Sequence, residues 1–167
     1  DAQGVKLFCR NTTVRGSANA FDRPLSSSFD EMDAFLILQD VFVPWKDVFV
    51  YKDVAASNAF YDTMQIRNHT GHQGIVRGLS KLELLSGIAV RLADALGLLR
   101  FMPVKEQLGQ LTSFIDLTRA AIEQCERDAV PSANGTLAPN ASVIQALRSQ
   151  FPKWYKAAIE TIQNLSS

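Results

Sequence analysis

The sequence predicts a mainly helical chain of the α+β class, in which a short β segment precedes an antiparallel helical bundle. Residues 1–53 contain short runs rich in Val, Phe, Ile and Leu, bounded by Gly, Pro or Asp, which is typical of strands. Residues 54–167 contain longer stretches whose apolar side chains recur every three or four positions, which indicates helices. The pattern changes only once, near Asp53.

Three segments of the first part are expected to be extended: residues 5–10, 34–43 and 47–51. Pro44 separates the last two, because proline lacks the amide hydrogen that a sheet ladder requires. Three short strands do not form a stable sheet alone. We therefore expect them to need further strands, or the helices that follow, as partners.

A polar loop from Arg23 to Asp33 joins the first two of these segments, and loops of this kind often carry binding groups. Paired carboxylates can perform acid–base chemistry when their environments separate their pKa values. More often a run of carboxylates is solvated or caps a turn, and we favour that interpretation here. The carboxylates in and near the loop are Asp30, Glu31, Asp33 and Asp40.

The first two helices are expected directly after the change of pattern. Asp53 or Ser57 is suited to cap a short helix, because both side chains accept hydrogen bonds from free backbone amides. A long helix is expected from about Met64 to Leu99. Its predicted buried stripe consists of Ile75, Leu79, Leu82, Ala89, Ala93 and Leu96.

Two further helices complete the predicted bundle. Pro103 marks the start of one, since proline is tolerated in a first turn, and Asn140 is suited to cap the other. Residues 131–139 between them have the composition of a loop, and Pro152 should kink or split the last helix. The predicted seams are Leu108, Leu111, Ile115, Thr118, Ile122 and Cys125, then Val143, Ile144, Leu147, Phe151, Trp154, Ala158, Ile159 and Ile162.

The long helix also carries four polar side chains, His69, His72, Gln73 and Arg77, whose spacing allows one shared face. We predict no metal site, because bundle metal sites use Glu-x-x-His pairs or several carboxylates, and Glu83 is distant. An anion or cofactor surface is the second interpretation, since these groups supply charged and neutral hydrogen bonds. From spacing alone, a polar stripe at a domain junction is favoured.

Composition limits the partners of the chain. The formal net charge is 0, from 17 basic and 17 acidic residues, which argues against nucleic acid as a partner. No apolar run is long enough to span a bilayer, so we expect no membrane partner and a cytoplasmic protein. Cys9 and Cys125 are expected to be free thiols.

Four collinear motifs stand out along the chain. They are Gly4–Arg10, Arg23–Ala34, Asp40–Trp45 with Val48–Phe49, and His72–Gln73 with Arg77 and Lys81. Together with Pro139–Asn140 and Phe151–Pro152, they resemble the 4-hydroxyphenylacetate 3-monooxygenase oxygenase family. This family has a fold similar to that of acyl-CoA dehydrogenases: a helical domain, a middle β domain, and a C-terminal bundle that builds a tetramer.

On this resemblance, residues 1–53 are the end of the middle β domain and residues 54–167 are the first part of the C-terminal bundle domain. The chain is then an internal fragment, as its start without Met and its end within a helical pattern also suggest. The family's catalytic residues lie upstream of these segments. We therefore place no catalytic residue in this chain and expect the fragment itself to be inactive.

The activity implied by the resemblance is that of the oxygenase component of a two-component aromatic monooxygenase. Reduced FAD comes from a separate NAD(P)H-dependent flavin reductase and forms a C4a-hydroperoxide with oxygen. A phenol such as 4-hydroxyphenylacetate is hydroxylated in the ortho position to a catechol, as in aromatic hydrocarbon catabolism. The resemblance places one wall of the flavin site at Ser26, Ser27, His72, Gln73 and Arg77, while Ser28 replaces the family's usual Arg.

Two alternatives stay open. The 4-hydroxybutyryl-CoA dehydratase branch shares the fold and binds an iron–sulfur cluster through a His and a Cys seven residues later. Leu79 and Val76 occupy the corresponding positions after His72 and His69, so the thiolate ligand that such clusters need is missing. The other alternative is a non-enzymatic helical oligomerisation module, which the regular apolar seam motivates.

Overall fold

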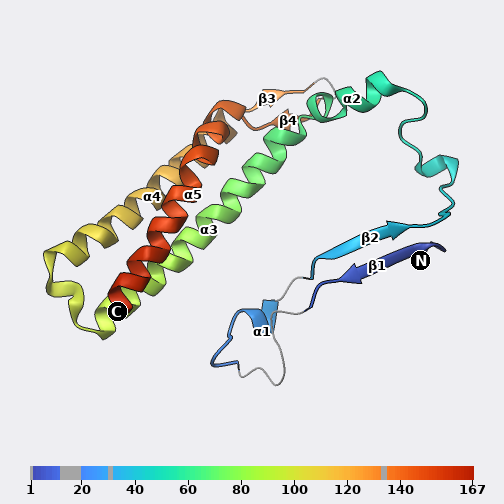
Figure 1. Ribbon diagram of the computed structural model, residues 1–167. Helices are drawn as coiled ribbons and strands as arrows, with labels where there is room; N and C mark the ends of the chain where they lie inside the picture. The colour runs from blue at the N-terminus through green and yellow to red at the C-terminus, as the bar shows by residue number, and fades with distance from the viewer. Residues whose placement is uncertain (1, 12–19, 30–31, 133–134) are drawn as a thin grey trace. The chain divides into compact units, whose positions relative to one another are not determined.

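The computed structural model describes residues 2–11, 20–29, 32–132 and 135–167. The chain divides into two compact units, Asp1–Lys52 and Asp53–Ser167. The first unit contains two of the three predicted strands, and the second contains the long helices (Figure 1).

The first unit is built around a two-stranded antiparallel ribbon. Strand β1 (Val5–Cys9) pairs with β2 (Ala34–Leu38), with Val5 opposite Leu38 and Cys9 opposite Ala34. Backbone hydrogen bonds extend the pairing at both ends, from Arg10 N to Asp33 O and from Gln39 N to Gly4 O. Every residue of both strands is exposed. That such short strands need further partners stays a prediction.

The prediction of a strand at residues 47–51 is wrong. Trp45–Asp47 forms the 3₁₀ helix η1, in which the amide of Asp47 donates to the carbonyl of Pro44 at 2.9 Å. The proline fixes φ at −66°, which suits a turn, and no neighbouring strand among the described residues offers an alternative partner. Strand β2 also ends at Leu38 rather than at residue 43.

The predicted loop between the strands contains the short helix α1 (Ser26–Phe29). The amides of Ser27 and Phe29 donate to the carbonyls of Arg23 and Leu25, which closes the turns of this helix. Of the four carboxylates expected here, Asp30 and Glu31 lie outside the described residues. Asp33 forms an ion pair with Arg10 at 3.6 Å, and the Asp33 side chain is 94% exposed.

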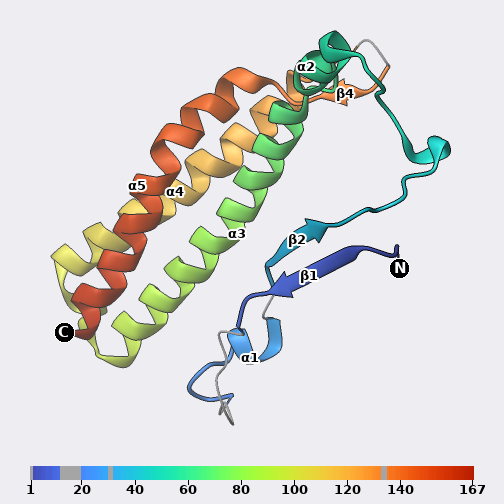
Figure 2. The same ribbon diagram turned by 45° about the vertical axis from the view of Figure 1, so that its right-hand side comes forward.

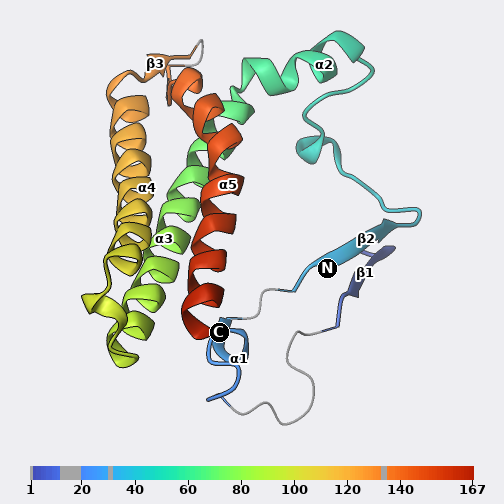
Figure 3. The same cartoon turned by 60° about the vertical axis from the view of Figure 1, so that its left-hand side comes forward.

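The second unit is a bundle of three long helices, which lie side by side in all three views (Figures 1, 2 and 3). Helix α4 runs antiparallel to both α3 and α5 (Figure 1). The elements of this unit are α2 (Val54–Thr63), α3 (Ile66–Ala95), η2 (Leu98–Arg100), α4 (Met102–Arg127), β3 (Val130–Pro131), β4 (Leu137–Ala138) and α5 (Ala141–Ser166).

The predicted helix starts are confirmed where local chemistry determines them. The Asp53 carboxylate accepts a hydrogen bond from Ala56 N at 2.9 Å, and the Asn140 side chain accepts one from Ser142 N at 2.9 Å. Pro103 lies in the first turn of α4, where no amide partner is needed. The segment predicted as a loop at residues 131–139 also contains the small β3–β4 ladder.

Helix α5 continues through Pro152, so the proline does not split it. A proline inside a helix removes one bond, to the carbonyl four residues earlier. The flanking turns of α5 pack against both α3 and α4, and this packing holds the helix together across the missing bond.

The core lies where the three helices face one another. The seam predicted on α4 is confirmed, with Leu111, Thr118 and Cys125 almost completely buried. Trp154 packs against both clusters of buried side chains and stacks on Phe114, with ring centroids 5.0 Å apart. Leu96 was expected in the stripe of α3 but is 53% exposed, because it follows the last turn of that helix.

No helix among the described residues combines the length and the apolar character needed to cross a bilayer.

Candidate functional site

Helix α3 positions the polar residues that the sequence singled out, and His72 points toward α4. The His72 Nε2 atom lies 2.8 Å from Oε1 of Glu126, and the His72 side chain is 23% exposed. The contact is a hydrogen bond when the imidazole is neutral and an ion pair when it is protonated. His72 therefore links α3 to α4 and has one ring nitrogen, Nδ1, left for another partner.

Gln73 and Arg77 lie elsewhere on α3. A helix turns by about 100° per residue, so Arg77 lies about 140° around the axis from His72. Both residues are exposed, and within the described part of the chain neither side chain makes a hydrogen bond or an ion pair. The expectation of one shared face is therefore wrong for His72, while Gln73 and Arg77 remain available for a ligand.

Ser26 and Ser27 belong to α1 in the first unit. Ser26 is half-buried, and the Ser27 hydroxyl donates to the carbonyl of Pro24 at 3.3 Å. Ser28, the residue where the resembled family usually has Arg, is exposed. The five residues expected at a flavin site thus divide between the two units, and their common role remains a prediction.

Two observations bear on other chemistries. Among the described residues, no group of three or more His, Cys, Asp or Glu side chains is placed to hold a metal ion. Burial, together with the negative charge of Glu126, raises the pKa of the Cys125 thiol. Because the thiolate is the reactive form, Cys125 is unsuited to act as a nucleophile.

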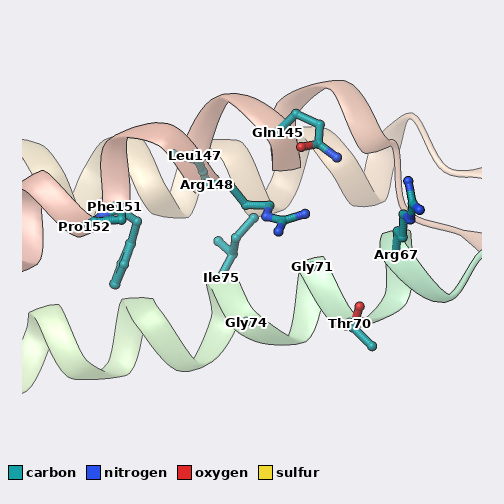
Figure 4. Close-up of a pocket in the computed structure, with 10 residues that line it drawn as sticks. All are labelled: Arg67, Thr70, Gly71, Gly74, Ile75, Gln145, Leu147, Arg148, Phe151 and Pro152. Carbon is teal, nitrogen blue, oxygen red and sulfur yellow. The ribbon is translucent and has the colours of Figure 1, made fainter.

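A cleft of about 630 Å³ lies between α3 and α5, and the sequence reasoning did not find it (Figure 4). Arg67 and Gly74 line it from α3, and Gln145, Arg148 and Phe151 line it from α5. Its residues come from two helices that are distant in the sequence, so spacing within either helix could not reveal it. The sequence feature that could have indicated the cleft is the presence of several glycines within α3. Glycine weakens a helix, so glycines inside one indicate a requirement of packing or function.

The glycines of α3 show how closely its neighbour approaches. A methyl group added to Gly71 would lie 2.5 Å from the Ile144 Cγ2 atom, so a larger residue would collide with α5. At Gly74, one turn later, an added methyl group would meet no neighbouring side chain and no other element within 4 Å in the described part of the chain. The helices therefore touch at Gly71 and leave open space at Gly74, which forms part of the wall of the cleft.

Comparison with protein families matches both units. The model described as 4-hydroxyphenylacetate 3-hydroxylase N terminal matches residues 1–50, and the corresponding C-terminal model matches residues 57–167. The chain is 30% identical over 164 residues to the 4-hydroxyphenylacetate 3-monooxygenase oxygenase component of Thermus thermophilus, covering 98% of this chain and 34% of that protein. It is 31% identical over 170 residues to the oxygenase component of 4-nitrophenol 2-monooxygenase from Rhodococcus, covering 99% of this chain and 32% of that protein.

Solved structures show the same relationship. A crystal structure of a 4-hydroxyphenylacetate 3-monooxygenase oxygenase component, complexed with FAD and 4-hydroxyphenylacetate, superposes with a TM-score of 0.89 at 30% identity, covering 99% of this chain and 35% of that one. An archaeal 4-hydroxybutyryl-CoA dehydratase superposes with a TM-score of 0.80 at 18% identity, covering 96% of this chain and 33% of that one, which shows a shared fold only.

The chain spans about a third of the length of these relatives, with 34% of the Thermus protein covered. Its two units match the N-terminal and C-terminal models in the order in which the sequence presents them. The chain belongs to the 4-hydroxyphenylacetate 3-hydroxylase family.

Proposed function

We propose that the gene product carrying this chain is the oxygenase component of a two-component, FAD-dependent monooxygenase that hydroxylates a phenol in the ortho position to give a catechol. The observation that supports this most strongly is the similarity, over 98% of the chain, to the Thermus oxygenase component. Relatives named for 4-hydroxyphenylacetate and for 4-nitrophenol share the phenol, so the phenol defines the proposed substrate class.

The flavin site is proposed to include Ser26, Ser27, His72, Gln73 and Arg77. Arg77 and Gln73 suit this role, because they are exposed and have no partner in the described part of the chain. A guanidinium group binds anionic oxygens, and an amide both donates and accepts hydrogen bonds. His72 contributes through Nδ1 only, since Glu126 occupies Nε2.

When bound, reduced FAD supplies the activation of oxygen, and the protein binds and orients the reactants and excludes water. The residues that grip the substrate are proposed to lie outside this chain. The proposal also includes a separate NAD(P)H-dependent flavin reductase, a homotetramer and a cytoplasmic location, where NAD(P)H is available to the reductase.

Observations on the bundle disfavour the two alternatives. The apolar seam that suggested an oligomerisation module is used inside the bundle, where Leu111 and Cys125 are 1% and 0% exposed. The dehydratase branch needs a thiolate that Leu79 and Val76 do not provide. Neither alternative is therefore supported by a specific feature of the described residues.

The test is a product assay with the purified gene product. Reduced FAD, oxygen and a panel of 4-hydroxyphenylacetate, 4-nitrophenol and phenol are supplied, and products are identified by chromatography and mass spectrometry. We expect a catechol from at least one phenol. A complete absence of hydroxylated product across the panel, from a folded preparation, would overturn the proposed activity.

The flavin residues are tested separately by equilibrium binding of FAD. Arg77→Gln removes a charged donor and should weaken binding by about 10-fold or more, since a hydrogen bond to a charged group contributes roughly 1.5–3 kcal/mol. Arg127→Gln on α4 is the matched control, because Arg127 is also exposed. Equal FAD affinity in the two variants would contradict the placement of Arg77.

A further inference from the structure

We infer that the cleft between α3 and α5 is a binding site for an organic phosphate, with Arg67 and Arg148 holding the phosphoryl group. This site is distinct from the proposed flavin wall, because neither Gln73 nor Arg77 lines the cleft. The inference rests on the charge of the lining, on its apolar part and on its shape.

The charge of the lining is entirely positive. Arg67 comes from α3 and Arg148 from α5, and no Asp or Glu of the described residues lines the cleft. Both side chains are exposed, and within the described part of the chain neither forms an ion pair or a hydrogen bond. Figure 4 shows the Arg148 guanidinium between the two helices, on the side toward Arg67. Two unneutralised guanidinium groups facing one space favour a ligand with two negative charges.

The chemistry of guanidinium narrows the ligand further. Its planar set of donors binds phosphate through paired hydrogen bonds, and a phosphate monoester supplies the oxygens for two such groups at once. A single carboxylate has one negative charge and would leave one arginine without charge compensation. Gln145, which also lines the cleft and has no partner in the described part of the chain, adds an amide donor beside Arg148.

The other part of the lining is apolar. Ile75, Leu147, Phe151 and Pro152 provide hydrocarbon and aromatic surface, so an apolar or aromatic group attached to the phosphate would be partly removed from water. The cavity volume of about 630 Å³ falls in the range of small-molecule sites. Inorganic phosphate alone would use only the charged end of this space.

Gly74 supports a role for the open space itself. Gly71 and Gly78 lie close to α5, because an added methyl group would lie 2.5 Å from Ile144 and from Phe151, respectively. Gly74 has no such neighbour, and a glycine inside a helix is less stable than alanine by about 0.5–1 kcal/mol. Because Gly74 has no side chain, the cleft stays open, and a ligand needs this open space to enter.

The test is a titration of the gene product with 1-naphthyl phosphate, followed by calorimetry. We expect saturable binding that 1-naphthol or inorganic phosphate alone does not reproduce, because each lacks one half of the recognised chemistry. Arg67→Gln and Arg148→Gln should each weaken binding by about 10- to 100-fold. Arg127→Gln on α4 is the matched control and should leave the affinity unchanged.

A second pair of variants tests the shape of the cleft without changing its charge. Gly74→Leu places a side chain in the cleft and should abolish binding, whereas Gly87→Leu on the same helix, also in open space, should not. Circular dichroism of every variant checks that the bundle is folded. Displacement of naphthyl phosphate by AMP but not by FAD would support the inference, whereas displacement by FAD would assign the cleft to the flavin site and would overturn it.

Failure of the inference is distinguishable from failure of the proposed function. Absence of saturable naphthyl phosphate binding to a folded protein would overturn the inference, and so would binding that the Arg67 and Arg148 variants leave intact. Binding that is lost in Arg77→Gln would assign the anion to the flavin wall and would also overturn it. The proposed hydroxylation is decided separately, by the presence of a catechol.

Discussion

Replacement of glycine by alanine at two positions of α3 should change stability in opposite directions. At Gly78 the added methyl group would lie 2.5 Å from Cζ and 2.6 Å from Cε2 of Phe151, whereas at Gly87 it meets no neighbouring side chain and no other element of the described residues within 4 Å. Carbon atoms prefer separations of about 3.5–4.0 Å, so Phe151 must move in the first variant. The ring packs against the larger buried cluster and stacks near Tyr155, which makes that movement unfavourable.

The magnitude follows from two terms. Alanine in a helix interior is more stable than glycine by about 0.5–1 kcal/mol, and this gain applies to both variants. Overpacking costs about 1–3 kcal/mol and applies to Gly78→Ala alone. Gly87→Ala should therefore stabilise the bundle by the first amount. The difference between the two free energies of unfolding should be about 1–3 kcal/mol, because the shared term cancels.

The assay is urea unfolding of the chain, followed by far-ultraviolet circular dichroism, which reports the long helices. A third variant, Phe151→Leu, removes the ring that the new methyl group meets. The penalty of Gly78→Ala should shrink in this background, as expected for residues in direct contact. Equal shifts for the Gly78 and Gly87 variants, or a penalty that persists without the Phe151 ring, would refute the argument from close packing.

Three further predictions concern the helix cap at Asn140 and the two cysteines. Asn140→Ala removes the acceptor for Ser142 N and should lower the free energy of unfolding by about 0.5–2 kcal/mol. Asn140→Asp keeps an acceptor and should retain most of that stability. Equal losses for the two variants in urea unfolding would contradict the cap. A thiol reagent should label exposed Cys9 rapidly and buried Cys125 only after unfolding, and equal rates in the folded chain would contradict the burial. Folding raises the pKa of Cys125, so the protonated thiol contributes to the free energy of unfolding. This contribution is fully present when the pH is below the ordinary pKa of a thiol, and it is lost as the pH rises through the raised pKa.

The bundle could be predicted because its determinants are local. A helix repeats its core contacts every three or four residues, so Leu111, Thr118 and Cys125 identify one buried face without knowledge of the partner helix. The caps at Asp53 and Asn140 are also local, since each side chain bonds an amide two or three residues later. A strand differs, because its hydrogen bonds go to another segment. The run at residues 47–51 had strand composition, but the described residues offer it no partner, and Pro44 favoured a turn instead.

The candidate sites show why sequence spacing alone could not define them. His72, Gln73 and Arg77 are close in sequence, yet the rotation of the helix directs His72 toward Glu126 on α4 and leaves Gln73 and Arg77 exposed. Arg67 and Arg148 are distant in sequence, yet α3 and α5 bring them to one cleft.

The small residues of α3 connect these observations. Gly71 and Gly78 allow α5 to approach closely, and Gly74, between them on the same face, keeps the space beside the contact open. The same helix therefore contacts α4 through His72 and contacts α5 through its glycines, while Gln73 and Arg77 remain outside both contacts. Because Arg67 lines the cleft and Arg77 does not, the phosphate and flavin proposals are tested by substitutions at different residues of α3.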